Sequence, residues 1–389
     1  MKASSRDDFI GGIDAANLRA GGGLTMLHAL INNTKTSDLG FKKIYLWGGR
    51  ETLDSVSDQD WLIKKNHSML NKNFIFRIIW QIFILPKAAR ELDCNVLFIP
   101  GGSYFGSFRP IVSMSTNLLP FEIREMKRFG FSINTLRLLL LRFTQSHTFR
   151  HSDGLIFLSS YAKEKILSIV KNVKCQTKII PFGVTSLQPI NNGLAVAPLD
   201  STPVRLIYVS FIGPYKHQIN VVHAVHKLRE QKYNVTIDLV GPNTNKKYSN
   251  RLIKLISNLD PQRQWVNLAG ELSSLELQKI TSDADIGVFA SSCENLPNIL
   301  LEMMSAGIPI ACSSYGPMPE VLQNGGEYFD PENPESISKA IQLLIDDPDQ
   351  ASYYAENNKQ RSREYSWEIF SKEVFKIMLE TAKLDNKSI

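Results

Sequence analysis

The sequence predicts an α/β protein built from two doubly wound domains, each with a parallel sheet between helices. The chain has 389 residues, the length of roughly two domains of ordinary size. Short apolar segments alternate with helix-like runs along both halves, a pattern typical of parallel sheets buried on both faces. Between the halves, residues 187–203 lack periodicity and are rich in proline, asparagine and glycine. We therefore expect two α/β domains joined by a linker.

The expected strands are short apolar segments. In the first half they are found at 9–14, 41–48, 95–101, 110–116, 154–160 and 177–183. In the second half they are found at 204–211, 235–241, 265–270, 286–291 and 308–313. The corresponding parts of the chain are an N-terminal domain over 1–186, the linker 187–203, a second domain over 204–365 and a last helix within 366–389. Doubly wound folds bind ligands beyond the carboxyl ends of their strands, so the functional loops should follow these segments.

The composition favours a folded cytoplasmic protein. Hydrophobic residues make up 43% of the chain and charged residues 21%, as in ordinary globular domains. The four cysteines are far apart and lack metal-ligand spacing, so we expect reduced thiols. Residues 1–12 are polar and acidic, whereas a signal peptide has a basic start and an apolar stretch. The apolar stretch 74–85 is too short to cross a membrane, so no transmembrane helix is expected.

The net charge of +6 is not spread evenly along the sequence. Basic side chains stand beside leucines within 122–130 and 134–151, namely Arg124, Lys127, Arg128, Arg137, Arg142 and Arg150. Such a mixture is typical of a basic amphipathic surface that lies against anionic lipid. A core-facing helix with solvated arginines is the alternative. Nucleic acid is a weaker partner for this charge, because no nucleic-acid-binding module or interleaved aromatic residues accompany it.

The most informative segment is "CENLPNILLEMMSAGIPIACSS" at 293–314, directly after a predicted strand. A helix should begin near Asn298, with Pro297 at its first position, where the missing N–H has no cost. Gly307 should end this helix. Free backbone N–H groups at such a helix start are suited to a phosphate or a sugar hydroxyl.

Two carboxylates of this segment can face one ligand, Glu294 in the loop and Glu302 on the second helical turn. A carboxylate accepts hydrogen bonds from two vicinal hydroxyls, as on a ribose or a hexose. The spacing therefore predicts that the two acids bind a nucleotide sugar. An ordinary solvated glutamate, favoured by the helix dipole, is the alternative for Glu302.

Two other loops contain residues suited to phosphate. Lys216 follows a predicted strand in "YVSFIGPYKHQ" and is either a point charge for phosphate or a solvated side chain. Three glycines, Gly21, Gly22 and Gly23, lead into a helix. They permit close backbone approach to a pyrophosphate, or form a plain flexible turn. The glycine loop matches neither the dinucleotide-binding fingerprint nor a P-loop.

Competing chemistries have weaker signatures. Residues 283–285 read Asp-Ala-Asp, like a known metal-binding motif, but they stand directly before a predicted buried strand. The sequence has no serine-hydrolase elbow and no zinc-binding histidine spacing. We therefore predict neither a metal site nor a cofactor.

The segment 293–314 resembles the donor-binding signature of the family 4 glycosyltransferases, which are retaining enzymes of the two-lobed GT-B fold. The signature has an acid, a short turn, seven residues and a second acid, followed by Gly-x-Pro. Here the acids are Glu294 and Glu302, and residues 307–309 complete the pattern. The resemblance covers nearly the whole chain and is strongest over 204–335. It implies two Rossmann-like domains that face each other across a cleft, with the last helix crossing back to the first domain.

For the second domain, the resemblance implies a role for each motif residue. Glu294 would contact the transferred sugar, and Glu302 would hold the ribose of the nucleotide. Lys216 would bind the donor diphosphate. The remaining lining residues would be Leu296, Pro297 and Asn298, with Gly270 where the nucleobase usually packs.

The phosphate-binding residues depart from the family at one position. Relatives often have an arginine where this chain has Phe211, so another cation such as Arg19 is expected to help hold the pyrophosphate. The resemblance also assigns Gly22 and Gly23 to the loop whose backbone meets the same charge.

The acceptor side shows a second departure. The segment 113–128 resembles the acceptor-side loop of the family, in which many relatives have a histidine near the reacting carbon. This chain has Thr116 and Asn117 there, so Asn117 is the catalytic candidate of the first domain.

The resemblance implies transfer of a sugar from a UDP- or GDP-linked donor to a hydroxyl of a glycan or lipid-linked glycan, as in lipopolysaccharide O-antigen or capsule synthesis. It implies retention of the anomeric configuration and no required metal. We expect a cytoplasmic protein, with an anionic membrane surface as a further partner at the inner face of the membrane. Two alternatives remain. A sugar-nucleotide epimerase or hydrolase would turn over donor without an acceptor, and a non-catalytic subunit of a glycan-assembly complex would bind donor weakly or not at all.

Overall fold

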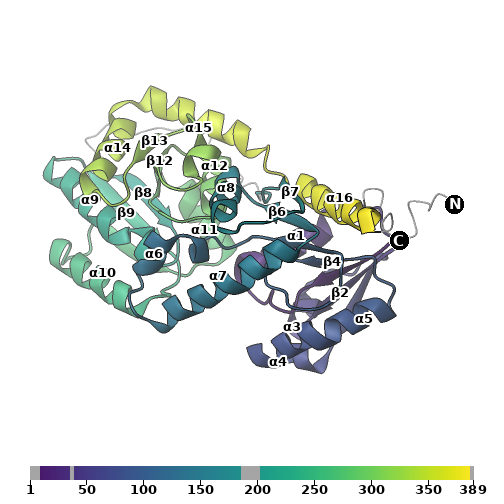
Figure 1. Cartoon of the computed structure of the whole chain (residues 1–389). Helices are drawn as coiled ribbons and strands as arrows, with labels where there is room; N and C mark the ends of the chain where they lie inside the picture. The colour runs from purple at the N-terminus through teal and green to yellow at the C-terminus, as the bar shows by residue number, and fades with distance from the viewer. Residues whose placement is uncertain (1–8, 36–38, 185–201, 386–389) are drawn as a thin grey trace. The chain divides into compact units, whose positions relative to one another are not determined.

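The structure, a computed structural model, describes residues 9–35, 39–184 and 202–385 (Figure 1). The chain forms two compact units. The first consists of Met1–Phe121, Phe131–Gly183 and Ser366–Ile389, and the second of Glu122–Gly130 and Val184–Tyr365. The linker predicted at 187–203 falls almost entirely outside the described residues.

The first unit contains a seven-stranded parallel sheet in the order β3-β2-β1-β4-β5-β6-β7. Its strands are β1 (Ile10–Asp14), β2 (Lys43–Gly48), β3 (Leu62–Asn66), β4 (Val96–Ile99), β5 (Ile111–Met114), β6 (Gly154–Phe157) and β7 (Gln176–Ile179). Strands β4, β5 and β6 are buried along their whole length, as expected for a parallel sheet covered on both faces. The strand order reverses at β1, which makes the unit doubly wound.

The helices of the first unit include the C-terminal one. They are α1 (Gly21–Asn32), α3 (Arg50–Ser55), α4 (Phe74–Ile79), α5 (Leu85–Glu91), α7 (Ile133–His151), α8 (Ser160–Ile169) and α16 (Trp367–Asp385). Helix α16, yellow in Figure 1, packs against α1 and against β4, β5 and β6. Phe370, Val374 and Met378 share one face of α16 and are fully buried. The last helix of the chain is therefore part of the first unit's core.

The second unit contains a six-stranded parallel sheet in the order β10-β9-β8-β11-β12-β13. Its strands are β8 (Val204–Val209), β9 (Val235–Val240), β10 (Val266–Gly270), β11 (Ile286–Phe289), β12 (Ile310–Ser313) and β13 (Glu327–Phe329). Its helices are α6 (Ile123–Lys127), α9 (Gln218–Glu230), α10 (Lys246–Leu259), α11 (Ser274–Ser282), α12 (Asn298–Ala306), α13 (Met318–Leu322), α14 (Pro334–Asp346) and α15 (Pro348–Ser362). Among the described elements of this unit, α6 alone comes from the part of the sequence before the linker.

The two parallel sheets confirm the predicted α/β class. Strands β3 and β13 lie outside the predicted segments, and each is an edge strand. The sequence of β3, "LIKKN", has only two apolar residues before it turns polar, and β13 has three residues in all. Neither strand has the continuous apolar run from which central parallel strands are recognised.

The described residues hold no helix that is both long and apolar enough to cross a bilayer. All four cysteines are free thiols, with Cys94, Cys293 and Cys312 buried and Cys175 partly exposed.

Candidate functional site

The site predicted around Glu294 lies at the carboxyl ends of β8 and β11, which are neighbours in the second sheet. The strand order reverses at β8, so this edge is the topological switch point, where doubly wound folds bind ligands. Glu294 lies in the loop between β11 and α12. After β8, the chain makes a short 3-10 helix, Pro214–Lys216, which places Lys216 at the same edge.

Helix α12 begins after a tight turn and ends at a glycine. Pro297 is its N-cap residue rather than its first helical residue, and the Asn298 N–H donates to the Leu296 carbonyl (3.0 Å). That N–H is therefore engaged within the chain, because the turn into the helix is tight, whereas we expected it to be free for a ligand. Gly307 ends the helix at a φ of 69°, in the left-handed region that favours glycine.

Lys216 and Glu294 form an ion pair at the centre of this edge. Lys216 is only 6% exposed, although its ammonium group is charged. Its Nζ lies 5.0 Å from the ring centroid of Phe211 and 5.4 Å from that of Tyr215. The carboxylate and the ring faces together offset the loss of water around the cation. Phe211, which stands where relatives often have an arginine, therefore contacts the lysine instead of adding a second charge.

The backbone around Lys216 is fixed as well as its side chain. The hydroxyl of Tyr208, on β8, donates a 2.6 Å hydrogen bond to the Lys216 carbonyl. The next residue, His217, has a φ of 53°, which ends the 3-10 helix and begins α9. Lys216 is thus held at a defined position between β8 and α9.

Glu302 differs from Glu294 in having no side-chain partner among the described residues. Its side chain lies on α12 and is partly buried. No hydrogen bond or ion pair joins its carboxylate to another described residue, and burial raises the pKa of this carboxyl to about 7. The group is therefore an unused acceptor, close to half-ionised at neutral pH, on the helix that follows the Glu294 loop.

The other predicted residues near this loop differ in whether they have unused hydrogen-bonding atoms. Leu296 is buried at 7% exposure, and Pro297 is buried beside it. The side-chain oxygen of Asn298 is buried and has no hydrogen-bond partner among the described residues. Buried acceptors are rarely left unsatisfied in folded proteins, so Asn298 is the residue of the three with spare bonding capacity toward a ligand.

Gly270, predicted to lie near the nucleobase, ends β10 at a φ of 69°. A Cβ at this position would meet no atom within 4 Å, so open space lies beside its backbone. Its carbonyl accepts a hydrogen bond from the Gly241 N–H (2.7 Å), which joins the ends of β9 and β10. The position leaves room for a flat ring, and the nucleobase contact stays a prediction.

The remaining predicted residues belong to the first unit. Gly22 and Gly23 lie in the first turn of α1, whose N-cap Ala20 gives no side-chain cap and whose first turn has no acidic residue. A Cβ at Gly22 would meet nothing within 4 Å. The start of α1 therefore presents backbone N–H groups in an open place, as anion-binding loops do.

Two arginines lie beside this glycine loop. Arg19 donates through Nη2 to the Leu70 carbonyl (2.7 Å). Arg77, which the sequence analysis does not single out, donates through Nη1 to the side-chain oxygen of Asn17 (2.9 Å). Burial, and to a lesser degree the nearby charge of Arg19, lowers the pKa of Arg77. No sequence signal pointed to Arg77, because it lies in an apolar helix about sixty residues after the loop.

Asn117, the catalytic candidate of the first unit, has a local structural role. Its side-chain oxygen accepts a hydrogen bond from the Leu119 N–H (3.1 Å), at the start of a 3-10 helix over Leu119–Phe121. This is the side-chain turn that asparagine often forms. This hydrogen bond explains why an asparagine stands here even if the residue has no role in catalysis. The catalytic role of Asn117 stays a prediction.

Comparison with known proteins supports the resemblance found in the sequence. Residues 192–361 match the family described as glycosyl transferases group 1, over the unit that contains Lys216, Glu294 and Glu302. The match spans somewhat less than half of the chain and confirms the resemblance to glycosyltransferases that the sequence predicts. An uncharacterized glycosyltransferase of Methanocaldococcus jannaschii is 25% identical over 59% of this chain and 61% of its own length. An MMP alpha-(1->4)-mannosyltransferase of Mycolicibacterium hassiacum is 26% identical over 58% of this chain and 53% of its own length. The chain thus matches little more than half the length of these relatives.

The glycosyltransferase fold extends beyond the matched family region. A crystal structure of the Anabaena protein HepE in complex with UDP and glucose covers 94% of this chain and 97% of its own, at a TM-score of 0.66 and 16% identity. The structural likeness and the two parallel sheets confirm the predicted GT-B fold, with two Rossmann-like units.

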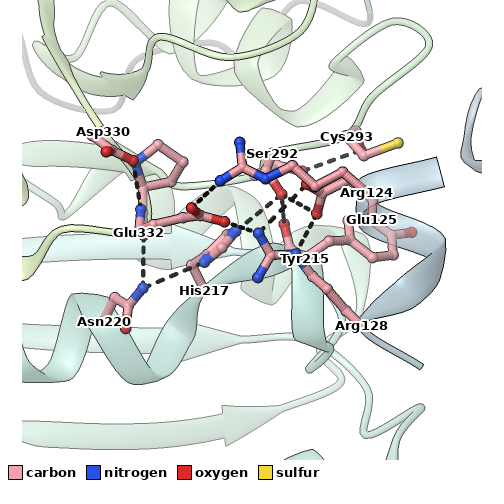
Figure 2. Close-up of polar contacts among 12 residues, drawn as sticks. Arg124, Glu125, Arg128, Tyr215, His217, Asn220, Ser292, Cys293, Asp330 and Glu332 are labelled. Carbon is pink, nitrogen blue, oxygen red and sulfur yellow. Dashed lines mark hydrogen bonds and ion pairs between the residues drawn. The ribbon is translucent and has the colours of Figure 1, made fainter. Parts of the chain in front are cut away.

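The loop of Tyr215 and His217 and the loop of Ser292, which flank Lys216 and precede Glu294, are joined by hydrogen bonds (Figure 2). The Ser292 N–H donates to the Tyr215 carbonyl (2.9 Å). The Ser292 hydroxyl lies 2.9 Å from Nε2 of His217. The sequence analysis missed Ser292 and His217 as supports of the site, although each is within two positions of a predicted residue.

The Asp-Ala-Asp segment has a structural role in the second sheet. The carboxylate of Asp285 accepts a hydrogen bond from the Arg205 N–H (2.8 Å) at the start of β8. Across the described ranges, no three histidine, cysteine or acidic side chains are grouped as a metal site would require.

Proposed function

We propose that the protein transfers a sugar from a UDP- or GDP-linked donor to a hydroxyl of a glycan or lipid-linked glycan, with retention of the anomeric configuration and without a metal. The observation that supports this best is the Lys216–Glu294 ion pair at the switch point of the second sheet, followed by the unpartnered Glu302 on α12. A buried cation suits a diphosphate, and two carboxylates suit the hydroxyls of a sugar and a ribose. The complex of HepE with UDP and glucose supports this ligand class.

On donor binding, the ion pair would be exchanged for contacts to the ligand. Lys216 turns to the diphosphate, and Glu294 accepts hydrogen bonds from the sugar hydroxyls. Glu302 accepts from the ribose, which favours its ionised form. These three side chains lie where water has little access. Their electrostatic attraction to the ligand is therefore stronger than it would be in bulk water. The Asn298 oxygen would gain the partner that it lacks.

The chemical step needs no protein nucleophile in this proposal. The bond between the anomeric carbon and the diphosphate oxygen breaks, and the acceptor oxygen bonds to the same face of that carbon. The acceptor proton passes to an oxygen of the leaving diphosphate. Lys216 stabilises the negative charge that develops there, and the N–H groups at Gly22 and Gly23 and the cation Arg19 are proposed to assist. Asn117 is proposed to contact the reacting groups from the acceptor side.

Thermal stabilisation by a panel of UDP-, GDP-, ADP- and dTDP-sugars tests the proposal. Wild type should be stabilised by one donor class, and Lys216→Ala and Glu302→Gln should be stabilised less at the same donor concentration. Lys254→Ala, at an exposed position on α10, is the matched control and should behave as wild type. Absence of stabilisation by any donor, in protein shown to be folded, would contradict the transferase proposal.

The two alternatives differ in what they do with the donor. An epimerase or hydrolase of this fold would consume the donor in the absence of any acceptor. A non-catalytic subunit would give neither product nor donor consumption. Assay of donor consumption with and without a glycan acceptor separates these from a transferase, which requires the acceptor.

We also propose that α7 binds an anionic membrane surface, which fits a lipid-linked acceptor and a role in O-antigen or capsule synthesis. Ile133, Leu136, Leu140 and Phe143 recur at helical spacing and are exposed, at 86% and 67% for the first and last. Arg137 and Arg142 stand beside this row. An exposed apolar row with flanking arginines is the pattern of helices that lie in a lipid interface.

Flotation with phosphatidylcholine vesicles, with and without phosphatidylglycerol, tests this surface. Wild type should float with the anionic vesicles, and Arg137→Gln/Arg142→Gln should reduce that fraction. Lys163→Gln/Lys171→Gln removes the same charge elsewhere in the first unit and should bind as wild type. No binding of wild type to either vesicle would rule out the membrane proposal.

A further inference from the structure

A short segment from the first half of the chain is built into the second unit. Glu122–Gly130, which contains α6, lies before the linker in sequence but belongs to the unit with the donor-binding candidates. In Figure 2, α6 enters beside the loops of His217 and Ser292. The family match begins at residue 192, so this segment lies outside it.

Two arginines hold the segment in place. Arg124 and Arg128 both form ion pairs with Glu332, in the turn after β13 (Figure 2). Arg128 also donates through Nε to a carboxylate oxygen of Glu125 (2.6 Å). The Glu332 N–H donates to Asp330 (2.9 Å), which fixes the turn that receives the arginines.

Glu125 faces the interior of the second unit. It is 3% exposed, and its Oε2 accepts a hydrogen bond from the Ser292 hydroxyl (2.6 Å). A carboxylate is a stronger acceptor than the Tyr215 carbonyl, which is 3.3 Å from the same hydroxyl, so the Ser292 proton points to Glu125. Ser292 precedes Glu294 by two residues.

The proton positions of the remaining link follow from this assignment. With its own proton directed at Glu125, the Ser292 oxygen accepts from Nε2–H of His217 at 2.9 Å. Burial is the main cause that lowers the pKa of His217 to about 4, so the ring is neutral. The contact with the Ser292 oxygen then assigns the single ring proton to Nε2. The other ring nitrogen, Nδ1, lies 3.4 Å from the Asn220 amide nitrogen, a donor. His217 directly follows Lys216.

We propose that Glu125 is a positioning residue of the donor site, acting through Ser292 and His217 to hold the Glu294 loop and the Lys216 loop at a fixed separation. The proposal rests on the proposed donor binding by Lys216 and Glu294. The segment Glu122–Gly130 then helps to position the donor site, although it precedes the linker in the sequence.

Substitutions at Glu125 distinguish a role in positioning the donor site from a role that only stabilises the fold of the second unit. Glu125→Ala removes the acceptor for Ser292, whereas Glu125→Gln retains an oxygen that accepts the same hydrogen bond. Both lose the charge opposite Arg128 and should lower the melting temperature. Donor affinity and kcat should fall about tenfold in Glu125→Ala, the effect of roughly one hydrogen bond, and by less than about threefold in Glu125→Gln.

The link through Ser292 gives a second, independent readout. Ser292→Ala should lower donor affinity as Glu125→Ala does, and the double variant should be no worse than either, because both break one connection. Lys254→Ala, at an exposed position on α10, is the control and should leave donor affinity unchanged. Wild-type affinity in Glu125→Ala, or additive losses in the double variant, would overturn the proposal.

The hydrogen-bond chain can be tested without a donor. The His217 Nε2–H should give a slowly exchanging imidazole resonance in the NMR spectrum of wild type, and Ser292→Ala and Glu125→Ala should shift or remove it. If wild type bound no donor, the proposed function would fail, whereas an unchanged resonance in both variants would refute the positioning chain itself.

Discussion

The two units present their ligand-binding candidates in different ways. In the second unit, charged side chains converge at one sheet edge, where Lys216 and Glu294 pair and further hydrogen bonds link their loops. In the first unit, the candidate at α1 is mainly backbone, because Gly22 and Gly23 offer N–H groups and the nearby Arg19 is bonded to a carbonyl. Loss of one side chain should therefore damage the second unit's site far more than loss of one glycine damages the first.

The largest effect is expected for Lys216→Ala. This change removes the cation proposed to stabilise the leaving diphosphate and leaves Glu294 without its partner. The rate of sugar transfer should fall at least about a hundredfold, as when a single preorganised stabilising group is removed from an active site. Steady-state assays with a saturating acceptor check this, with Lys254→Ala as control. A rate within about twofold of wild type would remove Lys216 from the mechanism.

The next effect, for Glu302→Gln, has opposite signs for binding and for stability. Donor affinity should fall about tenfold, because the amide replaces an ionised acceptor of the ribose hydroxyls. The free protein should become more stable at about pH 8, by at most roughly 3 kcal/mol. Burial raises the pKa of the Glu302 carboxyl in the folded protein to about 7, from 4.5 in the unfolded chain. The free energy of unfolding of the wild type therefore decreases as the pH rises from 4.5 through about 7.

Calorimetric titration and thermal unfolding measure the two effects of Glu302→Gln. Glu356→Gln, at an exposed position on α15, is the matched control. A decrease in the stability of the free Glu302→Gln protein at alkaline pH would show that the carboxylate has a partner that the structure lacks.

The same carboxyl predicts a pH dependence of donor binding. Ionised Glu302 accepts hydrogen bonds from ribose, and a pKa of about 7 means that most of it is protonated near pH 6. Affinity for a nucleoside diphosphate sugar should therefore fall a few-fold between about pH 8 and about pH 6. The donor itself has no group that titrates in this range. Glu302→Gln should show a flat profile, and a wild-type profile equally flat would contradict the assignment.

The smallest effect is expected in the first unit. Gly22→Ala adds a methyl group in open space, so the fold should tolerate it, and donor affinity should fall only about two- to fivefold if backbone N–H groups meet the diphosphate. Gly101→Ala, also in open space, is the control. Equal affinity in both variants would indicate that the glycine loop is a plain turn.

The sequence allowed prediction of the parts that depend on local pattern. Central strands such as β4 and β6 are continuous apolar runs, and Glu294, Glu302 and Lys216 stand at recognisable distances from such runs. Strands β3 and β13 could not be recognised, because β3 has only two apolar residues and β13 has three residues in all.

The rest depends on contacts between distant parts of the chain. Glu125 could not be predicted as a buried neighbour of Ser292, because its place is set by Arg128 and by Glu332, 204 residues further along. The unpaired state of Glu302 is similarly a property of the folded surroundings, since a glutamate near a helix start is commonly solvated.

The central claim is that Lys216 and its neighbours at the β8–β11 edge bind the donor diphosphate. Calorimetric titration of the preferred nucleoside diphosphate sugar into wild type, Lys216→Ala and Lys254→Ala tests it most directly. We predict equal affinity for wild type and Lys254→Ala, and affinity at least about tenfold weaker for Lys216→Ala, the loss of roughly one charge-assisted contact. Equal affinity in all three proteins would contradict the account.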